Sequence, residues 1–579
     1  MKHEKNSKRT LGWISAVAGA SKWLVAGLVA LQSLLSLTGI FYAFALRSVI
    51  NAAVAGNRRG FFGCLALLAG MLGLQILLQA LNRYLNEATH AAVENRFKSK
   101  LFSSLLTGDY ARVTATHSGE WMNRLTSDTV VVANGVTQIV PGLLGMLVRL
   151  TGALAALVWL ERRFLVILVP GGAAMLLLTY LFRRVLKRLH KRIQESDGAL
   201  RVFLQERLES LLIVRAFDRE AQSAEQADGL MAGHKAARLR RARFSGLCNM
   251  GFSAVMNGAY LLGIGFCGLG ILAGSMSYGD LMAIMQLIGQ VQSPFANITG
   301  YLPKLYAMLV SAERLMEAEQ FARDSENRLP HAQTLDFYRS EFVSLRMEHA
   351  CFAYQPPVQT EGGQPPMPVV LKDVGLEIRK GEYVVFTGPS GCGKSTVLKL
   401  LMCLYPLDSG ERILNTVHGR QALTPAFRGL FAYVPQGNQL LSGTIREIIA
   451  FGDEERARDD VTIYKALSIA CADEFVTALE NGLDTVLGER GTGLSEGQMQ
   501  RIAIARAVFS GHPILMLDEA TSALDEATAS RMLVNLRSMT DRTVILVTHR
   551  ADQAAIFDKE LSFARDGIQM KSRNGESSR

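Results

Sequence analysis

The chain has 579 residues, more than one hydrophobic core usually organises, so we expect at least two domains. Apolar residues make up 49% and charged residues 20% of it, which exceeds the apolar content of an ordinary soluble protein. The net charge of +10 fits a nucleic-acid partner or a membrane protein with basic cytoplasmic loops. The seven cysteines have no CxxC spacing, which argues against a disulfide framework and indicates thiols in a reducing compartment.

Residues 1–22 form a short basic segment, and no apolar core with a cleavage site follows it. We therefore expect no cleaved signal peptide, and we expect an interfacial helix around Leu11 to Ser21. The segment is too short for a peptidase domain, which disfavours exporters that cleave leader peptides.

Six segments between residues 23 and 315 are long and apolar enough to cross a membrane as helices. A bilayer core requires about 20 apolar residues in helical form. Buried helices of soluble proteins are rarely this long and this free of charge, so we predict a six-helix transmembrane domain. The segments are 23–46, 61–82, about 133–160 (interrupted by Arg149), 164–182, one within 244–279 and one within 281–303.

The two long connections, 83–129 and 183–243, are rich in Lys and Arg, whereas the other connections are short. Basic segments stay on the cytoplasmic side during insertion, so both connections, the N-terminus and the C-terminal half are expected there. This explains the positive charge without nucleic acid. Their amphipathic patterns predict that the membrane helices continue into the cytoplasm and turn back.

Several polar side chains stand inside the predicted spans. Gln286, Gln290, Ser293 and Asn297 recur at helical spacing on one face of the sixth span. They fit either hydrogen bonds between helices or the wall of a cargo cavity. Arg149, near the middle of the third span, requires a polar partner, water or anionic cargo, and we include it among the candidate cavity residues.

A phosphate-binding loop lies between a predicted strand at 382–386 and a predicted helix from 397. Its glycines allow backbone N–H groups to surround phosphates at a helix N-terminus. Lys394 is suited to the β- and γ-phosphates, and the Ser395 hydroxyl is suited to Mg²⁺. The loop consists of Gly388, Pro389, Ser390, Gly391, Cys392, Gly393, Lys394, Ser395 and Thr396.

An apolar run at 514–517, typical of a buried parallel strand, ends in Asp518 and Glu519. We expect Asp518 to hold Mg²⁺, directly or through water. Glu519 is placed to act as the general base that polarises the attacking water.

Residues 340–560 resemble the nucleotide-binding domain of ABC transporters, with the family's motifs in the family's order. The resemblance implies that Tyr354 stacks on adenine and that Gln436 contacts Mg²⁺ and the membrane domain. It also implies that His549 grips the γ-phosphate, and that Gln436 and His549 act in catalysis together with Glu519. It identifies Gly488 to Gly491 with a segment of the exporter branch. It also implies two further motifs, the signature Leu494, Ser495, Glu496, Gly497 and Gln498, and the D-loop Ser522, Ala523, Leu524 and Asp525.

The signature departs from the family's usual sequence by having Glu496 at its third position. Ser495 and Gln498 fit a capping box at a helix start, where an acidic residue is also favourable. We therefore expect the backbone still to serve the phosphate, and Glu496 to tune the turnover of ATP.

The resemblance extends into the membrane half. Residues 117–128 are similar to the first coupling segment of ABC exporters, residues 206–220 to the second, and residues 311–315 to the junction with the ATPase domain. It implies a type I (type IV) ABC exporter fold joined to an α/β P-loop NTPase domain. The expected division is 1–22, 23–315 (transmembrane), 316–340 (linker), 341–570 (nucleotide-binding domain) and 571–579 (tail).

The family implies a dimer in which the signature of one chain completes the ATP site of the other. The partner is a second half-transporter, and both a homodimer and a heterodimer are allowed. We expect ATP and Mg²⁺ as ligands, membrane lipid and a transported substrate as partners, no nucleic acid, and the cytoplasmic membrane of a bacterium as the location. The substrate is a hydrophobic or amphipathic small molecule, a lipid or a peptide. The alternatives are an importer or channel on the same fold, or a soluble ABC-type ATPase.

Overall fold

The computed structural model describes residues 2–319, 321, 328–354, 369–437, 440–488, 493–549, 557–564 and 567–572. The chain divides into two compact units, and each is described by itself. Unit 1 comprises Met1–Phe102 and Met122–Glu317, and unit 2 comprises Ser103–Trp121 and Ala318–Arg579.

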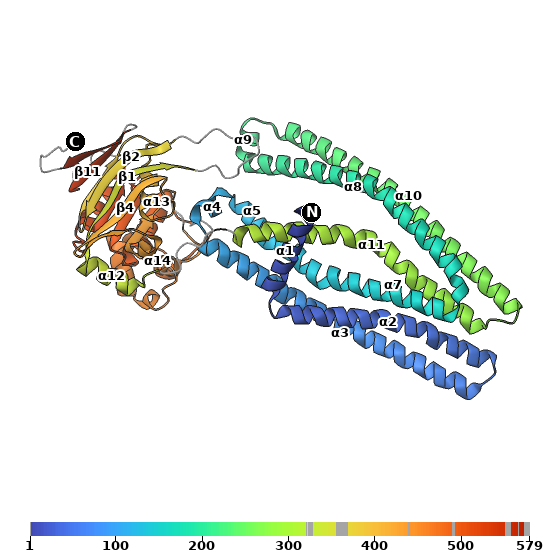
Figure 1. Cartoon of the computed structure of the whole chain (residues 1–579). Helices are drawn as coiled ribbons and strands as arrows, with labels where there is room; N and C mark the ends of the chain where they lie inside the picture. The colour runs from blue at the N-terminus through green and yellow to red at the C-terminus, as the bar shows by residue number, and fades with distance from the viewer. Residues whose placement is uncertain are drawn as a thin grey trace. The chain divides into compact units, whose positions relative to one another are not determined.

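In its described residues unit 1 consists of helices joined by short connections, and long helices dominate it (Figure 1). The long helices hold the six apolar segments found in the sequence. The helices are α1 (Lys2–Ala18), α2 (Ser21–Val54), α3 (Arg58–Thr107), α6 (Thr129–Asn134), α7 (Val140–Leu160), α8 (Leu165–Glu209), α9 (Leu211–Ala216), α10 (Glu220–Leu272) and α11 (Tyr278–Glu319), with π-helical turns at Arg124–Asp128 and Gly135–Ile139 and a 3₁₀ turn at Arg162–Phe164. The short helix α5 (Ser118–Asn123) spans the boundary at Trp121, and the last residues of α3 and α11 belong to unit 2.

Several of these helices exceed the thickness of a membrane. Within the described part of the chain, four stretches (Ser21–Val54, Arg58–Thr107, Ser118–Leu160 and Glu220–Leu272) are long and apolar enough to cross one. The helices α3 and α10 contain 50 and 53 residues, which correspond to roughly 75–80 Å against a bilayer core of about 30 Å. The prediction that the helices continue past the apolar segments into the long connections is therefore confirmed.

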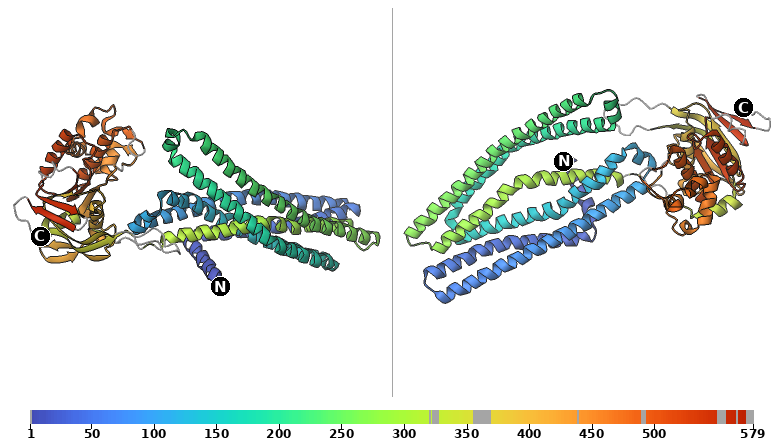
Figure 2. Two further views of the ribbon diagram at one scale, coloured as in Figure 1. Left: turned by 90° about the horizontal axis from the view of Figure 1, so that it is seen from above. Right: turned by 180° about the vertical axis from the view of Figure 1, so that it is seen from behind.

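Inside unit 1, α8 packs along α10 and α2 packs along α7, as the views of Figures 1 and 2 show. The small residues Ala43 and Ala153 are fully buried in the apolar cluster between α2, α7 and α11, so the helices approach closely. At one end of this cluster Arg47 forms an ion pair of 2.5 Å with Asp280. The backbone N–H of Gly279 donates a hydrogen bond to Asn51 there, so α2 and α11 are joined by polar contacts as well.

Residues 118–160 form one nearly continuous helical stretch with two wide turns of π type, at Arg124–Asp128 and Gly135–Ile139. The sequence predicted the apolar span from about residue 133 but not these turns. Near the first turn the buried carboxylate of Asp128 accepts hydrogen bonds from Ser311 (2.8 Å) and Arg314 (2.6 Å) of α11. The end of α11 is thereby held against this stretch.

Unit 2 contains two larger sheets with helices packed on them. Its helices are α4 (Tyr110–Ala115), α12 (His331–Ser340), α13 (Lys394–Leu401), α14 (Ile445–Ala450), α15 (Asp460–Ile469), α16 (Asp473–Thr477), α17 (Glu496–Phe509) and α18 (Glu526–Arg537), with short 3₁₀ turns at Pro425–Leu430, Arg456–Arg458 and Gly482–Asp484. Its strands are β1 (Phe342–Ala353), β2 (Val369–Arg379), β3 (Tyr383–Thr387), β4 (Ser409–Thr416), β5 (Gly419–Ala422), β6 (Phe431–Val434), β7 (Gly443–Thr444), β8 (Val486–Leu487), β9 (Ile514–Asp518), β10 (Thr543–Val547), β11 (Lys559–Ala564) and β12 (Gly567–Ser572).

The central sheet of unit 2 has the order β12-β11-β3-β10-β9-β6. The strands from β11 to β6 run parallel, and β12 pairs antiparallel with β11. Every residue of β9 and β10 is buried, as expected for parallel strands covered on both faces. An antiparallel sheet, β2-β1-β4-β5, and the short pair β7-β8 complete the unit. Parallel strands bring the carboxyl ends of β3, β6, β9 and β10 to one edge, where the site lies.

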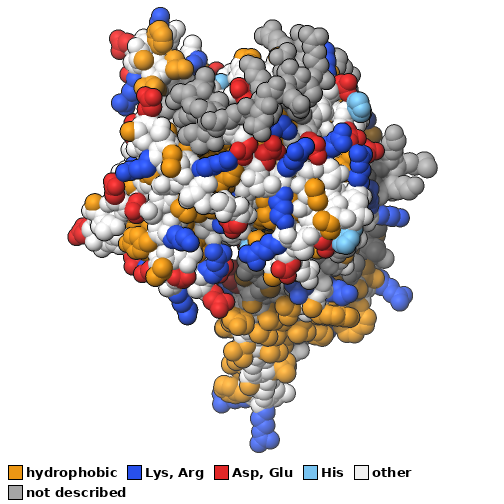
Figure 3. All heavy atoms as spheres, turned by 90° about the vertical axis from the view of Figure 1, so that its left-hand side faces the viewer, with side chains coloured by type: hydrophobic (Ala, Val, Ile, Leu, Met, Phe, Trp, Pro, Cys, Tyr) orange, Lys and Arg blue, Asp and Glu red, His pale blue; other side chains and the backbone are white. Residues whose placement is uncertain are grey.

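The surfaces of the two units differ in character. On the face of unit 2 drawn in Figure 3, Lys and Arg side chains are interspersed with Asp and Glu, as on ordinary soluble domains. Long apolar side chains of α3 are exposed, for example Phe62, Ile76 and Leu77 at 65–69%. An exposed apolar helix surface of this kind fits contact with lipid or with other membrane helices.

Candidate active site

The phosphate-binding loop connects β3 to α13, as the sequence predicted. The ammonium of Lys394 is buried and donates hydrogen bonds to the carbonyl groups of Gly388 (2.9 Å) and Pro389 (2.8 Å), and it lies 3.7 Å from the sulfur of Cys392. Thr396 is buried at the start of α13. Pro389, Ser390 and Gly391 form the exposed crest of the loop.

At two positions of the loop, steric contacts explain why the residue is glycine. Gly388 has φ +134°, and a Cβ atom there would lie 2.4 Å from the carbonyl oxygen of Phe563. Gly393 has φ +95° and would place a Cβ atom 2.8 Å from the side chain of Leu371. Both positions require glycine, since left-handed backbone and close packing coincide there.

Asp518, the last residue of β9, lies beside the loop with only 2% of its surface exposed. Its two carboxylate oxygens are bonded to different partners. The Ser395 hydroxyl donates to Oδ1 (2.9 Å), and the phenol of Tyr433 donates to Oδ2 (3.0 Å). Burial raises the pKa of Asp518 above its ordinary value, and the two hydrogen bonds oppose this shift. The carboxylate is therefore held in place before any ligand binds.

Glu519 follows Asp518 and adopts a left-handed backbone conformation, with φ +52°. This conformation is costly for a residue with a side chain, and such strain is concentrated at functional sites. One oxygen of its carboxylate lies 2.9 Å from Nε2 of His549, and the other accepts a hydrogen bond of 2.7 Å from Gln436. The three side chains predicted to be catalytic thus lie together at the carboxyl ends of β6, β9 and β10.

The D-loop, Ser522 to Asp525, lies between this carboxylate and α18. Asp525 is the N-cap of α18 and accepts a hydrogen bond from the backbone N–H of Thr528 (2.9 Å). Gln500, which is buried in α17, contacts the carbonyl group of Glu519 (3.1 Å) and the backbone N–H of Ala523 (3.2 Å). Gln500 therefore connects the D-loop to the residue that we expect to be the base.

The signature segment begins helix α17, and the predicted capping box is confirmed. The Ser495 hydroxyl accepts from the backbone N–H of Gln498 (3.3 Å), and the Gln498 side chain accepts from the backbone N–H of Ser495 (2.9 Å). Glu496 is exposed in the first helical turn, and Leu494 packs at the edge of the helical core. At Gly497 an added Cβ atom would lie 2.8 Å from the carbonyl oxygen of Ala523, so this position tolerates only glycine.

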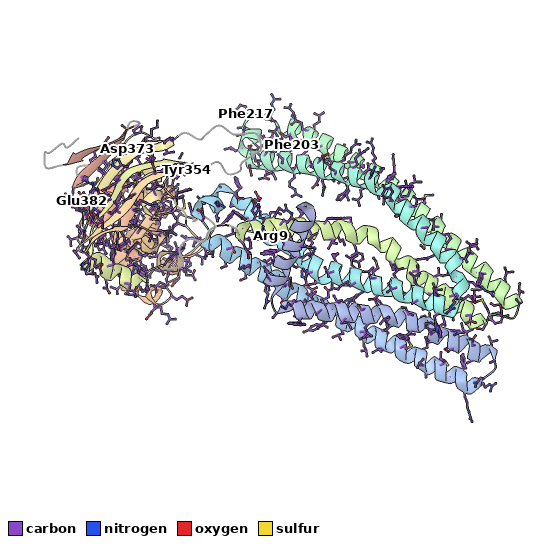
Figure 4. All side chains as sticks on the ribbon, viewed as in Figure 1. Arg9, Phe203, Phe217, Tyr354, Asp373 and Glu382 are labelled. Atoms are coloured by element: carbon purple, nitrogen blue, oxygen red, sulfur yellow. The ribbon has the colours of Figure 1, made fainter. Side chains whose placement is uncertain are left out.

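Tyr354 follows β1 and is labelled in Figure 4. Its hydroxyl lies 3.1 Å from that of Thr396, and its ring packs edge to face on Tyr405 at 5.4 Å between ring centres. Tyr110 of α4 also packs on Tyr405, at 5.6 Å between ring centres. The aromatic residue predicted to stack on adenine thus lies next to the phosphate-binding loop, and Tyr405 connects it to α4.

A cavity of about 910 Å³ extends from Ser395 and Asp518 past Gln436 toward α14 and α17. Apolar side chains such as Leu441 and Phe451 line it together with Arg506 and Arg456. Leu441 and Phe451 are exposed at 58% and 64%, so the wall of this cavity is available to another segment.

The candidate cavity residues of unit 1 lie on two helices. Arg149 of α7 lines a cavity of about 60 Å³ together with Gln32 and Ser36 of α2 and Tyr301 of α11. Gln290 lies against Gly39 of α2, where an added Cβ atom would be 2.9 Å from its side-chain nitrogen. Gln286, which lies on α11 together with Gln290, is half-buried. The side chains of Ser293 and Asn297, and residues 489–491 of the exporter segment, lie outside the described residues.

Residues 25–295 match the family described as ABC transporter transmembrane region, and residues 371–522 match the family described as ABC transporter. The "ATP-binding cassette sub-family B member 10, mitochondrial" of Mus musculus is 30% identical over 551 residues, which cover 90% of this chain and 72% of the mouse protein. The chain belongs to the ABC transporter family.

This ABC transporter is also similar to the "Multidrug resistance ABC transporter ATP-binding and permease protein" of Lactococcus lactis, with 28% identity over 76% of this chain and 72% of that protein. Among solved structures, a bacterial Atm1-family ABC exporter with ATP bound has a TM-score of 0.78. It is 22% identical, and the match covers 96% of this chain and 95% of that chain. The shared fold is a helical membrane domain followed by a nucleotide-binding domain.

The family assignment makes the chain a multi-pass membrane protein and an ATPase coupled to the movement of substances across a membrane. Sequence reasoning missed three residues of this ABC transporter's site. Tyr433 lies three residues before the predicted Gln436 but was not itself predicted, and Gln500 and Tyr405 have no local signal. Their contacts join residues at least 19 positions apart, which no spacing pattern predicts.

Proposed function

We propose that two copies of this chain, or this chain and a related half-transporter, export a hydrophobic or amphipathic substrate by ATP-driven alternating access. The observation that carries the proposal is the arrangement around Glu519. Its carboxylate is held by Gln436 and His549 and lies next to the buried Asp518, in a chain that also has helices of membrane length.

In the proposed mechanism the phosphate-binding loop receives the β- and γ-phosphates of ATP. Lys394 exchanges the carbonyl groups of Gly388 and Pro389 for phosphate oxygens, since an ammonium forms stronger hydrogen bonds with an anion. The N-terminus of α13 and the loop N–H groups add favourable electrostatics. Tyr354 stacks on adenine, and its contact with Thr396 aligns the base with the phosphates.

The donor set at Ser395 and Asp518 fits Mg²⁺. A hydroxyl oxygen and a carboxylate oxygen lie 2.9 Å apart there, and both are hard ligands. In the described part of the chain no group of three or more His, Cys, Asp or Glu forms a complete metal cage. This suits Mg²⁺, which typically binds through one or two protein oxygens, water and substrate phosphates. Ser395 and Asp518 would hold the ion, with Gln436 nearby, and the ion would neutralise charge on the phosphates.

Glu519 acts as the general base. Because Gln436 and His549 each occupy one of its oxygens, the carboxylate is oriented before ATP arrives. On binding, His549 turns its donor toward the γ-phosphate, and the freed oxygen of Glu519 accepts a proton from the attacking water. The strained backbone of Glu519 holds the carboxylate at the strand end, where the water must lie.

The signature segment serves the ATP site of the partner chain. In this segment Ser495 and Gln498 bond to each other's backbone N–H groups and so form the start of α17. The exposed start of α17 presents backbone N–H groups to the γ-phosphate of the partner's ATP. Contact between Gly497 and Ala523 transmits the position of this helix to the D-loop. One chain alone therefore holds half of each site, and closure of the dimer completes both.

Two cytoplasmic turns convey the closure to the membrane helices. Tyr110 of α4 already packs within unit 2, on Tyr405. The turn between α8 and α10 carries exposed apolar residues, Leu212 at 82% and Phe217 at 72%, and Figure 4 labels Phe217 there. We propose that this turn enters the cavity beside Gln436 on the partner chain, which has exposed apolar walls.

The proposed location is the cytoplasmic membrane of a bacterial cell, with the N-terminus and the ATPase domain in the cytoplasm. The proposed domain division follows the sequence: 1–22, the transmembrane domain 23–315, a linker 316–340, the nucleotide-binding domain 341–570 and a tail 571–579. The basic connections 83–129 and 183–243 support the orientation.

The test is the variant Glu519→Gln in the full-length protein in liposomes. We expect ATP binding to persist and the hydrolysis rate to fall by about 10²- to 10⁴-fold, because the amide cannot accept the proton. ATP-dependent uptake into inverted vesicles should stop with it. Glu526→Gln, an exposed acid at the start of α18, is the matched control and should hydrolyse ATP at the wild-type rate. Hydrolysis by Glu519→Gln at the wild-type rate would refute the assignment of the base.

A further inference from the structure

The six predicted membrane segments contain a single Lys, Arg, Asp, Glu or His residue, which is Arg149. It stands in α7, eleven residues or roughly 16 Å before the helix ends at Leu160. Since a bilayer core is about 30 Å thick, the backbone of Arg149 lies near its middle. A charged side chain at this depth is costly and typically marks a substrate pathway.

The structure places Arg149 at a polar pocket between α2, α7 and α11. Gln32, Ser36 and Tyr301 line the pocket with it. Glycines on α7 create the space: a Cβ atom at Gly145 would lie 2.6 Å from Gln32, and one at Gly142 would lie 2.9 Å from Tyr301. Both glycines lie on the helical face of Arg149, seven and four residues before it.

The polar lining continues along α2. Gly39 lies one turn beyond Ser36 and receives the side chain of Gln290 from α11. Two helices, α2 and α11, therefore contribute amide and hydroxyl groups to the region that Arg149 of α7 reaches. All of these groups are neutral, so they do not cancel the charge of a guanidinium.

We propose that this pocket binds the anionic group of an amphipathic substrate, a carboxylate, sulfonate or phosphate carried by an apolar body. The proposal rests on the proposed export function and specifies its substrate class. The predicted membrane segments contain one basic residue and no acidic residue, so an anionic group of the substrate is complementary in charge to this region. A planar guanidinium with neutral hydrogen-bonding neighbours is well suited to a small oxyanion.

The size of the pocket fits the anionic group of the substrate but not its apolar body. A volume of about 60 Å³ holds an anionic group or a few water molecules, but not a whole cargo molecule. The apolar body would lie outside it, against residues such as Met146. The anion has two possible sources, a soluble amphipath or an anionic lipid, and the experiment distinguishes them.

The experiment measures binding to the full-length protein in phosphatidylcholine nanodiscs, without ATP. The probes are 1-pyrenebutyrate and 1-pyrenebutanol, which share an aromatic body and differ in charge. In a second arm, acyl-labelled phosphatidylglycerol is compared with acyl-labelled phosphatidylcholine. We expect the anionic member of at least one pair to bind about tenfold to a hundredfold more tightly, the range of one charge-assisted hydrogen-bonded contact.

The variant Arg149→Gln should abolish this preference, and Arg149→Lys, which keeps the charge, should retain most of it. Arg163→Gln is the matched control, because it removes the same charge from a side chain that is 80% exposed outside the membrane segments. If Arg149→Gln fails to fold, the charge preference of the wild-type protein and of Arg149→Lys still decides the matter.

A preference for pyrenebutyrate that depends on Arg149 supports a soluble anion, and a preference for phosphatidylglycerol supports a lipid. Equal binding of the charged and uncharged members of both pairs, or an equal loss of both in Arg149→Gln, overturns the proposal and leaves Arg149 a hydrated structural residue. Because these measurements need no hydrolysis, their failure is separate from a failure of the Glu519→Gln test.

Discussion

The phenol of Tyr433 donates a hydrogen bond of 3.0 Å to Oδ2 of Asp518, and it does so three residues before Gln436 on the same strand end. The residue expected to hold Mg²⁺ is thereby connected to the segment that contacts Glu519, the proposed base. A shift of Asp518 therefore moves Tyr433, and Tyr433 is only three residues from Gln436 in the chain.

The variant Tyr433→Phe should loosen this connection. It leaves one oxygen of a buried carboxylate without its donor, which costs about 1–3 kcal/mol locally. Hydrogen exchange at the ends of β6 and β9 should become faster, and the concentration of Mg²⁺ required for half-maximal ATPase should rise. Tyr464→Phe on α15 is the matched control. Unchanged exchange and Mg²⁺ dependence in Tyr433→Phe would show that the hydrogen bond is dispensable.

The variant Gly497→Ala should disrupt the start of α17. Its Cβ atom would lie 2.8 Å from the backbone oxygen of Ala523, so the signature segment or the D-loop must move. We expect ATPase activity to fall by at least about tenfold, since a misplacement of about 1 Å can cost a hundredfold. Gly233→Ala on α10 has open space around it and should hydrolyse ATP normally. Full activity of Gly497→Ala would show that the two loops are not in contact during turnover.

The variant Glu496→Gly tests the departure of the signature from the family's usual sequence. Glu496 is exposed at the first turn of α17, where it stabilises the helix and, in the proposed dimer, would repel the phosphate of the partner's ATP. We expect the KM for ATP to fall by about threefold to tenfold, together with a change in turnover. Glu526→Gly, at the same position of α18, controls for the loss of helix stability. An effect of equal size in both variants would assign Glu496 a structural role alone.

Acid should destabilise unit 2 through His512. Burial lowers its pKa below the ordinary value of 6.5, and the positive charges of His331, Arg542 and Arg456 contribute, while the hydrogen bond to the carbonyl group of Gly429 opposes the shift. Below pH 6.5 the unfolded chain binds a proton that the folded chain does not, so stability is full above pH 6.5 and is lost as pH falls through the lowered pKa. The melting temperature should therefore drop less steeply from pH 7 to 5 in His512→Gln than in the wild type. His418→Gln, at an exposed position, should follow the wild-type slope.

Local patterns in the sequence were sufficient for much of this protein. The lengths of its apolar segments predicted the membrane helices. The strand, loop and helix pattern around Lys394 predicted the phosphate-binding loop. The capping box of Ser495 and Gln498 was predictable for the same reason, because it joins residues three positions apart. Each of these features depends on residues that are neighbours in the chain.

Tertiary structure alone decided the contacts that complete the sites. Tyr433 reaches Asp518, Gln500 reaches the D-loop, and Gln32, Ser36 and Tyr301 surround the pocket of Arg149, across large separations in sequence. Such contacts arise from the order of parallel strands and the packing of small residues such as Gly142 and Gly145 between helices. The physical reason is that side-chain periodicity encodes which face of an element is buried, whereas the partner of that face depends on the whole fold.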